Sequence, residues 1–190
     1  MEAHEAARIA LENVLEATTG ESIMIVCDDE KRKVGKAFAD GALALGLWTR
    51  MMVLQTSKKP RTEIPAQLFE IFTQQKPDLY VNLMRGIREE TPFRIGIVKM
   101  ETRDRRSRLG HCPGVTIDML TEGALALTPQ EHKTMQSHAE RLLQTLNGTI
   151  EVEIRSPAGT SLTLSAEKRE FFTDTKLDWK SMKWMNLSLS

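Results

Sequence analysis

The stretch SIMIVCDD, Ser22 to Asp29, decides the fold. A continuous apolar run with β-branched residues is typical of a strand that is covered on both faces. The pair Asp28-Asp29 ends the run, and the segment after it, Glu30 to Leu45, has apolar residues at helical spacing. Either aspartate is placed to cap that helix. A buried strand followed directly by a helix is the first unit of a layered α/β fold.

Helices and buried strands alternate on both sides of this stretch. An amphipathic helix is predicted over Ala3 to Ala17, strands over Leu47 to Leu54 and Leu79 to Met84, and a helix from Pro65 to Gln75. Strands that alternate with helices imply right-handed crossovers and a parallel sheet. We therefore predict a three-layer α/β fold of the Rossmann or flavodoxin-like type, with helices on both faces of the sheet.

A second informative stretch is RLGHCPGVT, Arg108 to Thr116. After a helix that begins near Thr91-Pro92, Arg108 to Cys112 is predicted to be a fourth strand. The Pro-Gly pair then makes a turn into a short helix, for which Thr116 is a suitable cap. A capping box over Thr128 to Glu131 predicts another helix that reaches about Leu146.

The pattern changes after this helix. Two segments with alternating apolar and polar residues, around Val152 and Leu162, predict an antiparallel hairpin that turns through residues 156–159 and extends the sheet domain. The last segment, residues 176–190, shows neither a helical nor a strand period in its apolar residues. We expect an α/β domain over residues 1–147, a β-hairpin extension over residues 148–175 and an incomplete tail over residues 176–190.

The composition limits the function classes. Lys plus Arg and Asp plus Glu both count 26, so the net charge is zero and no nucleic-acid partner is expected. No apolar run is long enough to span a membrane, and the N-terminus is acidic and amphipathic, unlike a secretory signal. Cys27 and Cys112 are isolated thiols, which fits a reducing compartment. The sequence favours a cytoplasmic protein without a membrane partner.

One local charge pattern stands out, since six basic residues accompany two acidic ones from Arg94 to Arg108. A solvated helix end is the ordinary explanation, because basic residues favour helix C-termini and surfaces. The alternative is a patch that binds an anion or a partner protein.

In an open parallel sheet, ligands collect beyond the carboxyl ends of the strands. The polar residues predicted there form a candidate ligand site: Asp28, Asp29, Asn82, Arg85, His111 and Cys112. Structural roles are also open for them. The aspartates cap helices, and Arg85 pairs with Glu89 or Glu90.

The sequence carries no catalytic signature that we can complete. His111 and Cys112 are adjacent on a strand, so their side chains point to opposite faces and do not form a nucleophile pair. His132 and His138 are six residues apart and lie on different helix faces. No dinucleotide, P-loop, hydrolase-elbow or zincin motif occurs. We predict no catalytic residue, no metal site and no cofactor.

The order of segments resembles the N-terminal part of the aminopeptidase T family. The closest motifs are the Pro-Gly-Val-Thr turn, Pro113 to Thr116, and the hairpin Ser-Pro-Ala-Gly-Thr-Ser-Leu, Ser156 to Leu162. The resemblance also covers SIMIVCDD, PDLYVNLM and the helix TPQEHKTMQSHAERLLQTLNG. This family comprises metallopeptidases, and its fold is shared by iron-dependent dihydroxypyridine dioxygenases.

The resemblance implies that the HCPGVT segment is an architectural junction of strand, turn and helix. It also implies that the metal ligands lie in a C-terminal half, which follows a segment that Trp184 and Asn186-Leu187 resemble. We expect a non-catalytic or truncated N-terminal domain that forms a homo-oligomer or binds a catalytic partner chain. Trp179, Met182, Trp184 and Met185 would form an apolar contact patch. The alternatives are a small-molecule binding module at the strand ends and a small thiol enzyme that uses Cys112.

Overall fold

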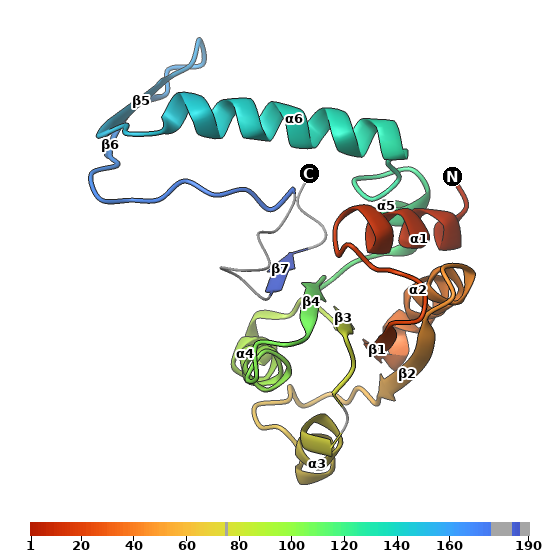
Figure 1. Cartoon of the computed structure of the whole chain (residues 1–190). Helices are drawn as coiled ribbons and strands as arrows, with labels where there is room; N and C mark the ends of the chain where they lie inside the picture. The colour runs from red at the N-terminus through yellow and green to blue at the C-terminus, as the bar shows by residue number, and fades with distance from the viewer. Residues whose placement is uncertain (75, 176–183, 187–190) are drawn as a thin grey trace.

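The computed structural model describes residues 1–74, 76–175 and 184–186. Its centre is a five-stranded parallel sheet in the order β2-β1-β3-β4-β7 (Figure 1). The strands are β1 (Ser22–Asp28), β2 (Trp48–Leu54), β3 (Leu79–Leu83), β4 (Arg108–His111) and β7 (Trp184–Asn186). This order matches the doubly wound flavodoxin-like arrangement, with β7 in the fifth place. The predicted fold class is confirmed.

The two faces of the sheet are covered by different helices. One core joins Ile23, Ile25 and Val81 of the strands to α1 (Ala3–Asn13), α2 (Arg32–Ala44) and α5 (Ile117–Thr121). The other joins Met24, Val26 and Tyr80 to α3 (Ala66–Gln74) and α4 (Thr91–Glu101). Neighbouring strand residues alternate between the cores because successive side chains point to opposite faces. The continuous apolar sequence of β1 is therefore the signature of burial on both sides.

Helices α1 and α2 pack closely on the first face. A Cβ atom added at Gly41 would lie 2.7 Å from the main-chain nitrogen of Arg8 and 2.7 Å from the carbonyl oxygen of His4. No side chain larger than hydrogen fits at this crossing unless the two helices move apart. The 3-10 turn η1 (Asp29–Lys31) leads from β1 into α2.

Two residues predicted as helix caps occupy N-cap positions but do not cap through their side chains. Asp28 and Thr116 stand at the N-cap positions of η1 and α5, but neither side chain makes a capping hydrogen bond. Helix α2 is preceded by Lys31 and has no side-chain cap. The Asp28 carboxylate is directed into a buried ion cluster instead, which is described below.

The chain leaves the sheet through α6 (Pro129–Leu146). The predicted capping box is confirmed: Thr128 Oγ1 accepts a hydrogen bond from the Glu131 N–H at 3.2 Å, and the Glu131 carboxylate accepts one from the Thr128 N–H at 2.7 Å. The hairpin β5 (Glu151–Arg155) and β6 (Ser161–Ser165) lies at the far end of this helix (Figure 1). After β6 the chain runs back along α6 toward the sheet.

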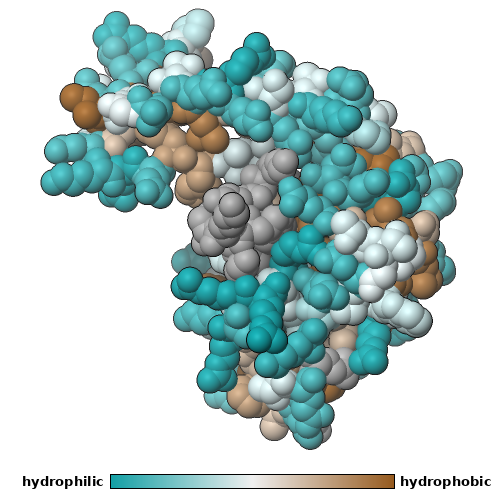
Figure 2. Space-filling model, viewed as in Figure 1, coloured by the Kyte–Doolittle hydropathy of each residue, from teal (hydrophilic) through white to brown (hydrophobic). Residues whose placement is uncertain are grey.

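The hairpin presents one apolar face. Ile154 pairs with Leu162 and Val152 pairs with Leu164, so these side chains share a face, and three of them, Ile154, Leu162 and Leu164, are exposed. Figure 2 shows hydrophobic surface on this projecting part of the molecule. The hairpin is predicted correctly from its alternation, but it forms a separate two-stranded sheet and does not extend the central one.

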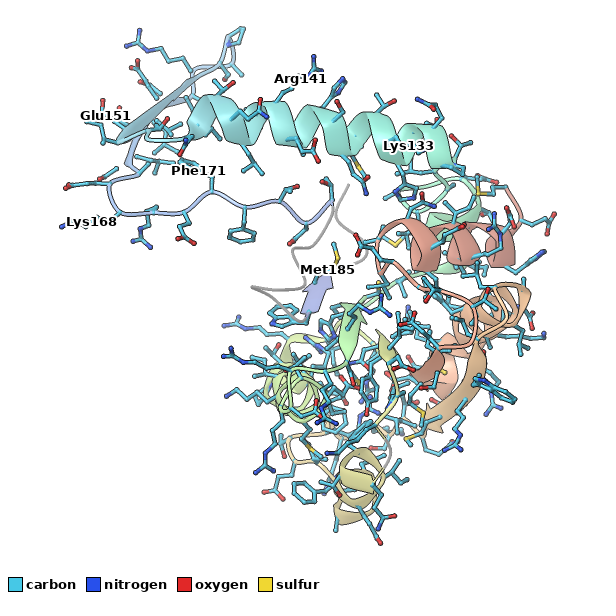
Figure 3. The ribbon with its side chains drawn as sticks, in the orientation of Figure 1. Lys133, Arg141, Glu151, Lys168, Phe171 and Met185 are labelled. Carbon is cyan, nitrogen blue, oxygen red and sulfur yellow. The ribbon has the colours of Figure 1, made fainter. Side chains whose placement is uncertain are left out.

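The C-terminal tail contributes a strand that its sequence does not reveal. Trp184 pairs with Leu109 and Met185 with Gly110, in parallel. Met185, labelled in Figure 3, is buried in the core beneath α1 and α2, whereas Trp184 is exposed. Trp179, Met182 and Leu187, which belong to the predicted patch and family segment, lie outside the described residues. In the part of the chain that the structure describes, no helix has the length and apolar content needed to cross a membrane.

Candidate functional site

The carboxyl end of β1 places Asp28 at the centre of a buried ion cluster. Its side chain is fully buried. Oδ2 accepts a hydrogen bond from the main-chain N–H of Arg85 at 2.6 Å, which ties the end of β3 to β1. Oδ1 forms an ion pair with Arg61, with 2.7 Å between Oδ1 and Nη2. Asp28 therefore holds together the segments that follow β2 and β3.

Glu90 is the second buried carboxylate of this cluster. It lies in η2 (Arg88–Glu90) and accepts hydrogen bonds from Arg61 Nη2 at 2.8 Å and from Arg85 Nη2 at 2.5 Å. Burial alone would raise the pKa of Glu90, but the hydrogen bonds from Arg85 and Arg61 outweigh it and lower the pKa to about 2. The carboxylate is thus ionised and occupied by two guanidinium groups. Of the two glutamates predicted as partners for Arg85, Glu90 is confirmed.

Arg94 fixes the loop between β3 and α4. Its Nη1 donates to the carbonyl oxygens of Arg85 at 3.1 Å and Ile87 at 2.8 Å. The side chain is buried, which lowers its pKa. At the other end of the same basic stretch, Arg108 pairs with Glu21 and donates to the carbonyl oxygen of Leu15. The solvated helix end predicted here is found at Arg103, Arg105 and Arg106, which are exposed, whereas Arg94 and Arg108 at the two limits of the stretch have internal partners.

Asp29 has a separate role at the rim of this edge. Its Oδ1 accepts hydrogen bonds from the N–H of Thr56 at 3.1 Å and from Thr56 Oγ1 at 2.6 Å. These bonds, Thr56 Oγ1 first, lower the pKa of the Asp29 carboxyl. They anchor the polar segment after β2, so Asp29 fixes a loop.

Asn82 and His111 lie side by side on β3 and β4, facing α4. Asn82 Nδ2 donates to Oε2 of the buried Glu101 at 2.6 Å. The His111 ring packs edge-on against Trp184, with 6.3 Å between ring centroids. Burial, with a smaller contribution from the Arg94 charge, lowers the pKa of His111 to about 4, so the imidazole is neutral. Nδ1 of His111 is buried without a hydrogen-bond partner among the described residues.

The two cysteines are buried in the opposite layer. Cys27 and Cys112 both belong to the core beneath α1 and α2, whereas His111 faces α4. The prediction that His111 and Cys112 point to opposite faces is confirmed. Burial raises the pKa of the Cys27 thiol to about 11, so this thiol is protonated at neutral pH.

The chemistry of this edge follows from its pairing. Each buried carboxylate already contacts guanidinium or main-chain N–H groups, so a ligand that used Asp28 or Glu90 would have to break those contacts. Among residues 1–74, 76–175 and 184–186, no three His, Cys, Asp or Glu side chains come together in a way that could hold a metal ion.

The structure brings together some of the predicted site residues and adds others. Asp28 and Arg85 share one cluster, Asn82 and His111 adjoin under α4, Asp29 lies at the rim and Cys112 faces away. Arg61 and Glu101 are not predicted from the sequence, because Arg61 lies in a polar loop and Glu101 lies among exposed basic residues. The helical spacing of Phe93, Ile97 and Glu101 on α4 is the signal that could have placed Glu101 inward.

This geometry defines an open, doubly wound α/β unit with an internal ion cluster at the carboxyl ends of its strands. No protein-family model matches the sequence, and no curated protein matches it. Among solved structures, 2,5-dihydroxypyridine dioxygenase from Pseudomonas putida KT2440 superimposes with a TM-score of 0.54 at 15% sequence identity, over 87% of this chain and 48% of that chain. Wild-type AmpT, the aminopeptidase T of Thermus thermophilus, does so with a TM-score of 0.50 at 14% identity, over 86% of this chain and 53% of that chain.

These comparisons establish a shared fold. The chain spans about half the length of the two proteins that it matches. The similarity covers most of this chain and is one of fold.

Proposed function

We propose that these residues form a non-catalytic domain of the kind found in aminopeptidase T-like proteins, which docks through its hairpin onto a catalytic partner or a second copy. The observation that carries this proposal is the exposed apolar face of β5 and β6. A two-stranded sheet is marginal in water on its own. An exposed apolar face of this kind therefore favours a protein partner that covers it.

The surroundings of the hairpin support a docking role. A hollow of about 630 Å³ lies beside it, with Leu143, Leu146, Ile150 and Phe171 in its lining. Figure 3 labels Phe171 on the segment after β6, next to the C-terminal end of α6. Ile150 is 71% exposed and Phe172 is 69% exposed. Apolar side chains thus extend from the hairpin along the returning chain.

The ion cluster at the strand ends supports a non-catalytic role for the sheet. Asp28 and Glu90 stabilise the loops after β2 and β3 and are already paired. By the resemblance to aminopeptidase T, the metal ligands belong to another half of such a protein, and the two similar structures are about twice as long as the matched region. Peptidase or dioxygenase chemistry would then depend on the residues of that other half.

The test is metal analysis of the purified polypeptide by inductively coupled plasma mass spectrometry, with an aminopeptidase assay in added cobalt or zinc. We expect no stoichiometric metal and no peptide hydrolysis. Sedimentation analysis should show self-association that weakens when Ile154 and Leu162 are both changed to threonine. Stoichiometric metal with hydrolysis would contradict the non-catalytic role, and a monomer unaffected by the changes would contradict docking onto a second copy.

A second candidate function is binding of a small anion at the strand ends. Nη1 of Arg61 and Nε of Arg85 are buried and have no hydrogen-bond acceptor among the described residues. Guanidinium N–H groups of this kind suit a phosphate or carboxylate. Added phosphate should then raise the melting temperature of the wild-type chain and leave that of the Arg85→Ala variant unchanged.

A further inference from the structure

A pocket of about 310 Å³ lies at the opposite end of the strands from the ion cluster, between α3 and α4 at the amino end of β3. It lies away from the ion cluster, on the side where the chain enters β3 and β4. Six of the residues that line it carry the argument: Phe72, Lys76, Tyr80, Met100, Glu101 and Arg103. Its volume falls at the lower end of the range for small-molecule sites.

Glu101 gives this pocket a buried polar group. The residue is 3% exposed, and its Oε2 accepts the hydrogen bond from Asn82. Its Oε1 is buried and has no partner among the described residues. Burial raises the pKa of Glu101 to about 8, against the opposing effect of the Asn82 hydrogen bond, so the group is protonated at neutral pH. Because Oε2 is an acceptor for Asn82, the proton belongs on Oε1, which is then a donor that needs an acceptor.

The rest of the lining has an aromatic and thioether wall, the hydroxyl residues Thr73 and Ser107, and charged groups at the rim. Phe72 and Tyr80 meet edge to face, with ring centroids 6.0 Å apart, and Met100 lies beside them. Lys76 and Arg103 are exposed at the rim, where Lys76 Nζ also lies 3.7 Å from an Asp104 carboxylate oxygen. Two positive charges against one negative charge favour a ligand with an anionic end that faces solvent.

These three features match one kind of ligand. A flat ring suits the aromatic and thioether wall, a carbonyl oxygen suits the Glu101 donor, and a carboxylate suits the rim. We propose that the pocket binds a small aromatic carboxylate that carries a carbonyl oxygen on the opposite side of its ring. The carbonyl accepts a hydrogen bond from Glu101, and the carboxylate faces Arg103 and Lys76.

The protonation of Glu101 makes binding depend on pH. The other ionisable groups around it are Tyr80, Lys76, Arg103 and Asp104, with His111 beyond Asn82. Burial and the Glu101 charge raise the pKa of Tyr80, and His111 is neutral, so neither changes charge between pH 7 and 9. Loss of the Glu101 proton above about pH 8 removes the donor and places a negative charge at the carbonyl. Affinity should fall roughly tenfold from pH 7 to pH 9.

The test uses 4-acetylbenzoate, whose ketone accepts hydrogen bonds but does not donate them, titrated calorimetrically into the full chain. We expect binding at pH 7 that is about tenfold weaker for benzoate, which lacks the ketone, and for acetophenone, which lacks the carboxylate. The Glu101→Gln variant keeps an N–H donor at the same place, so its affinity should stay constant up to pH 9. Arg103→Ala should weaken binding, whereas Arg106→Ala, an exposed arginine of the same loop, should not.

Three results with the wild-type chain would overturn the proposal. They are no binding of 4-acetylbenzoate at millimolar concentration, equal binding of acetophenone, and wild-type binding that does not change between pH 7 and pH 9. Loss of binding in Arg85→Ala, with Arg103→Ala unaffected, would place the anion at the strand-end cluster and would also contradict this site. Circular dichroism of each variant checks that its fold is intact.

Discussion

Arg61 and Glu90 are joined by three hydrogen bonds. Glu90 Oε1 accepts from the main-chain N–H of Arg61 at 2.9 Å and from its Nε at 3.1 Å, and Oε2 accepts from its Nη2 at 2.8 Å. The Arg61 guanidinium also lies 4.8 Å from the centre of the Phe93 ring. These contacts fix the loop after β2 to the start of α4, near the carboxyl end of β3.

Removal of the Glu90 carboxylate should destabilise the protein strongly. In Glu90→Ala the guanidinium groups of Arg61 and Arg85 lose a buried partner, and breaking such a pair costs about 3–5 kcal/mol. Glu89→Ala, at the exposed neighbouring position, should change the free energy of unfolding by less than about 0.5 kcal/mol. Urea denaturation of the two variants measures the difference. Equal stabilities would show that the cluster does not stabilise the fold.

The same carboxylate predicts acid sensitivity. The pKa of Glu90 is about 2 in the folded chain, below its ordinary value of 4.5, so the unfolded chain binds the proton first as pH falls. Its stabilising contribution should be complete above about pH 5 and should disappear as the pH falls from 4.5 toward 2. Unfolding free energies of wild type and Glu90→Gln, measured across this range, should converge at the acid end. A constant difference would contradict the assignment.

Glu101 predicts the opposite trend at higher pH. Its pKa of about 8 lies above the ordinary value of 4.5, so the folded chain keeps a proton that the unfolded chain has lost. Stability should fall as pH rises from 4.5 to 8 and then level off. Glu101→Gln should remove this decrease, whereas Glu140→Gln, at an exposed position on α6, should retain it. Denaturation at pH 5, 7 and 9 tests the trend.

The crossing of α1 and α2 predicts different outcomes for two helical glycines. Gly41→Ala would press a Cβ atom against the main chain of α1, at a cost of about 1–3 kcal/mol. At Gly96 the added Cβ would lie 2.9 Å from Cδ1 of Ile64, the end of a flexible side chain. Since alanine also favours the helix, Gly96→Ala should change the free energy of unfolding by less than about 1 kcal/mol. Thermal denaturation of both variants compares them.

The buried thiols predict low reactivity. Cys27 and Cys112 are each 0% exposed, so the folded protein should react slowly with a thiol reagent such as Ellman's reagent at pH 8. Both thiols should react at once in denaturant. Rapid labelling of Cys112 in the folded chain would contradict this burial and would revive the thiol-enzyme hypothesis.

The sequence predicts the parts of this fold that depend on local pattern. The apolar run of β1, the box at Thr128 and the alternation of β5 and β6 each have a signal within a few residues. The strand β7 has three residues and gains its order from pairing with β4, which no local pattern records. Asp28 illustrates the same limit: its position favours a cap, but a more favourable partner, Arg61, comes from a distant loop.

The candidate site is less predictable for the same reason. The strand-end rule places Asp28 and Arg85 together, because the carboxyl ends of β1 and β3 adjoin in a parallel sheet. It does not say whether those groups will be free for a ligand or paired with one another. That depends on Arg61 and Glu90. The Arg61 guanidinium lies over the Phe93 ring and pairs with Glu90, and these contacts arise from tertiary packing.

The parallel pairing of Leu109 with Trp184 has a consequence for how the chain acquires its structure. During synthesis, β4 emerges long before β7, and α6 and the hairpin are made in between (Figure 1). Until residues 184–186 arrive, the outer hydrogen-bonding groups of β4 are open to pairing with any other extended strand. Pairing over so large a sequence separation is also slow. Until then β4 is an edge strand that is unpaired on its outer side, and the newly made chain is most prone to aggregate during this period.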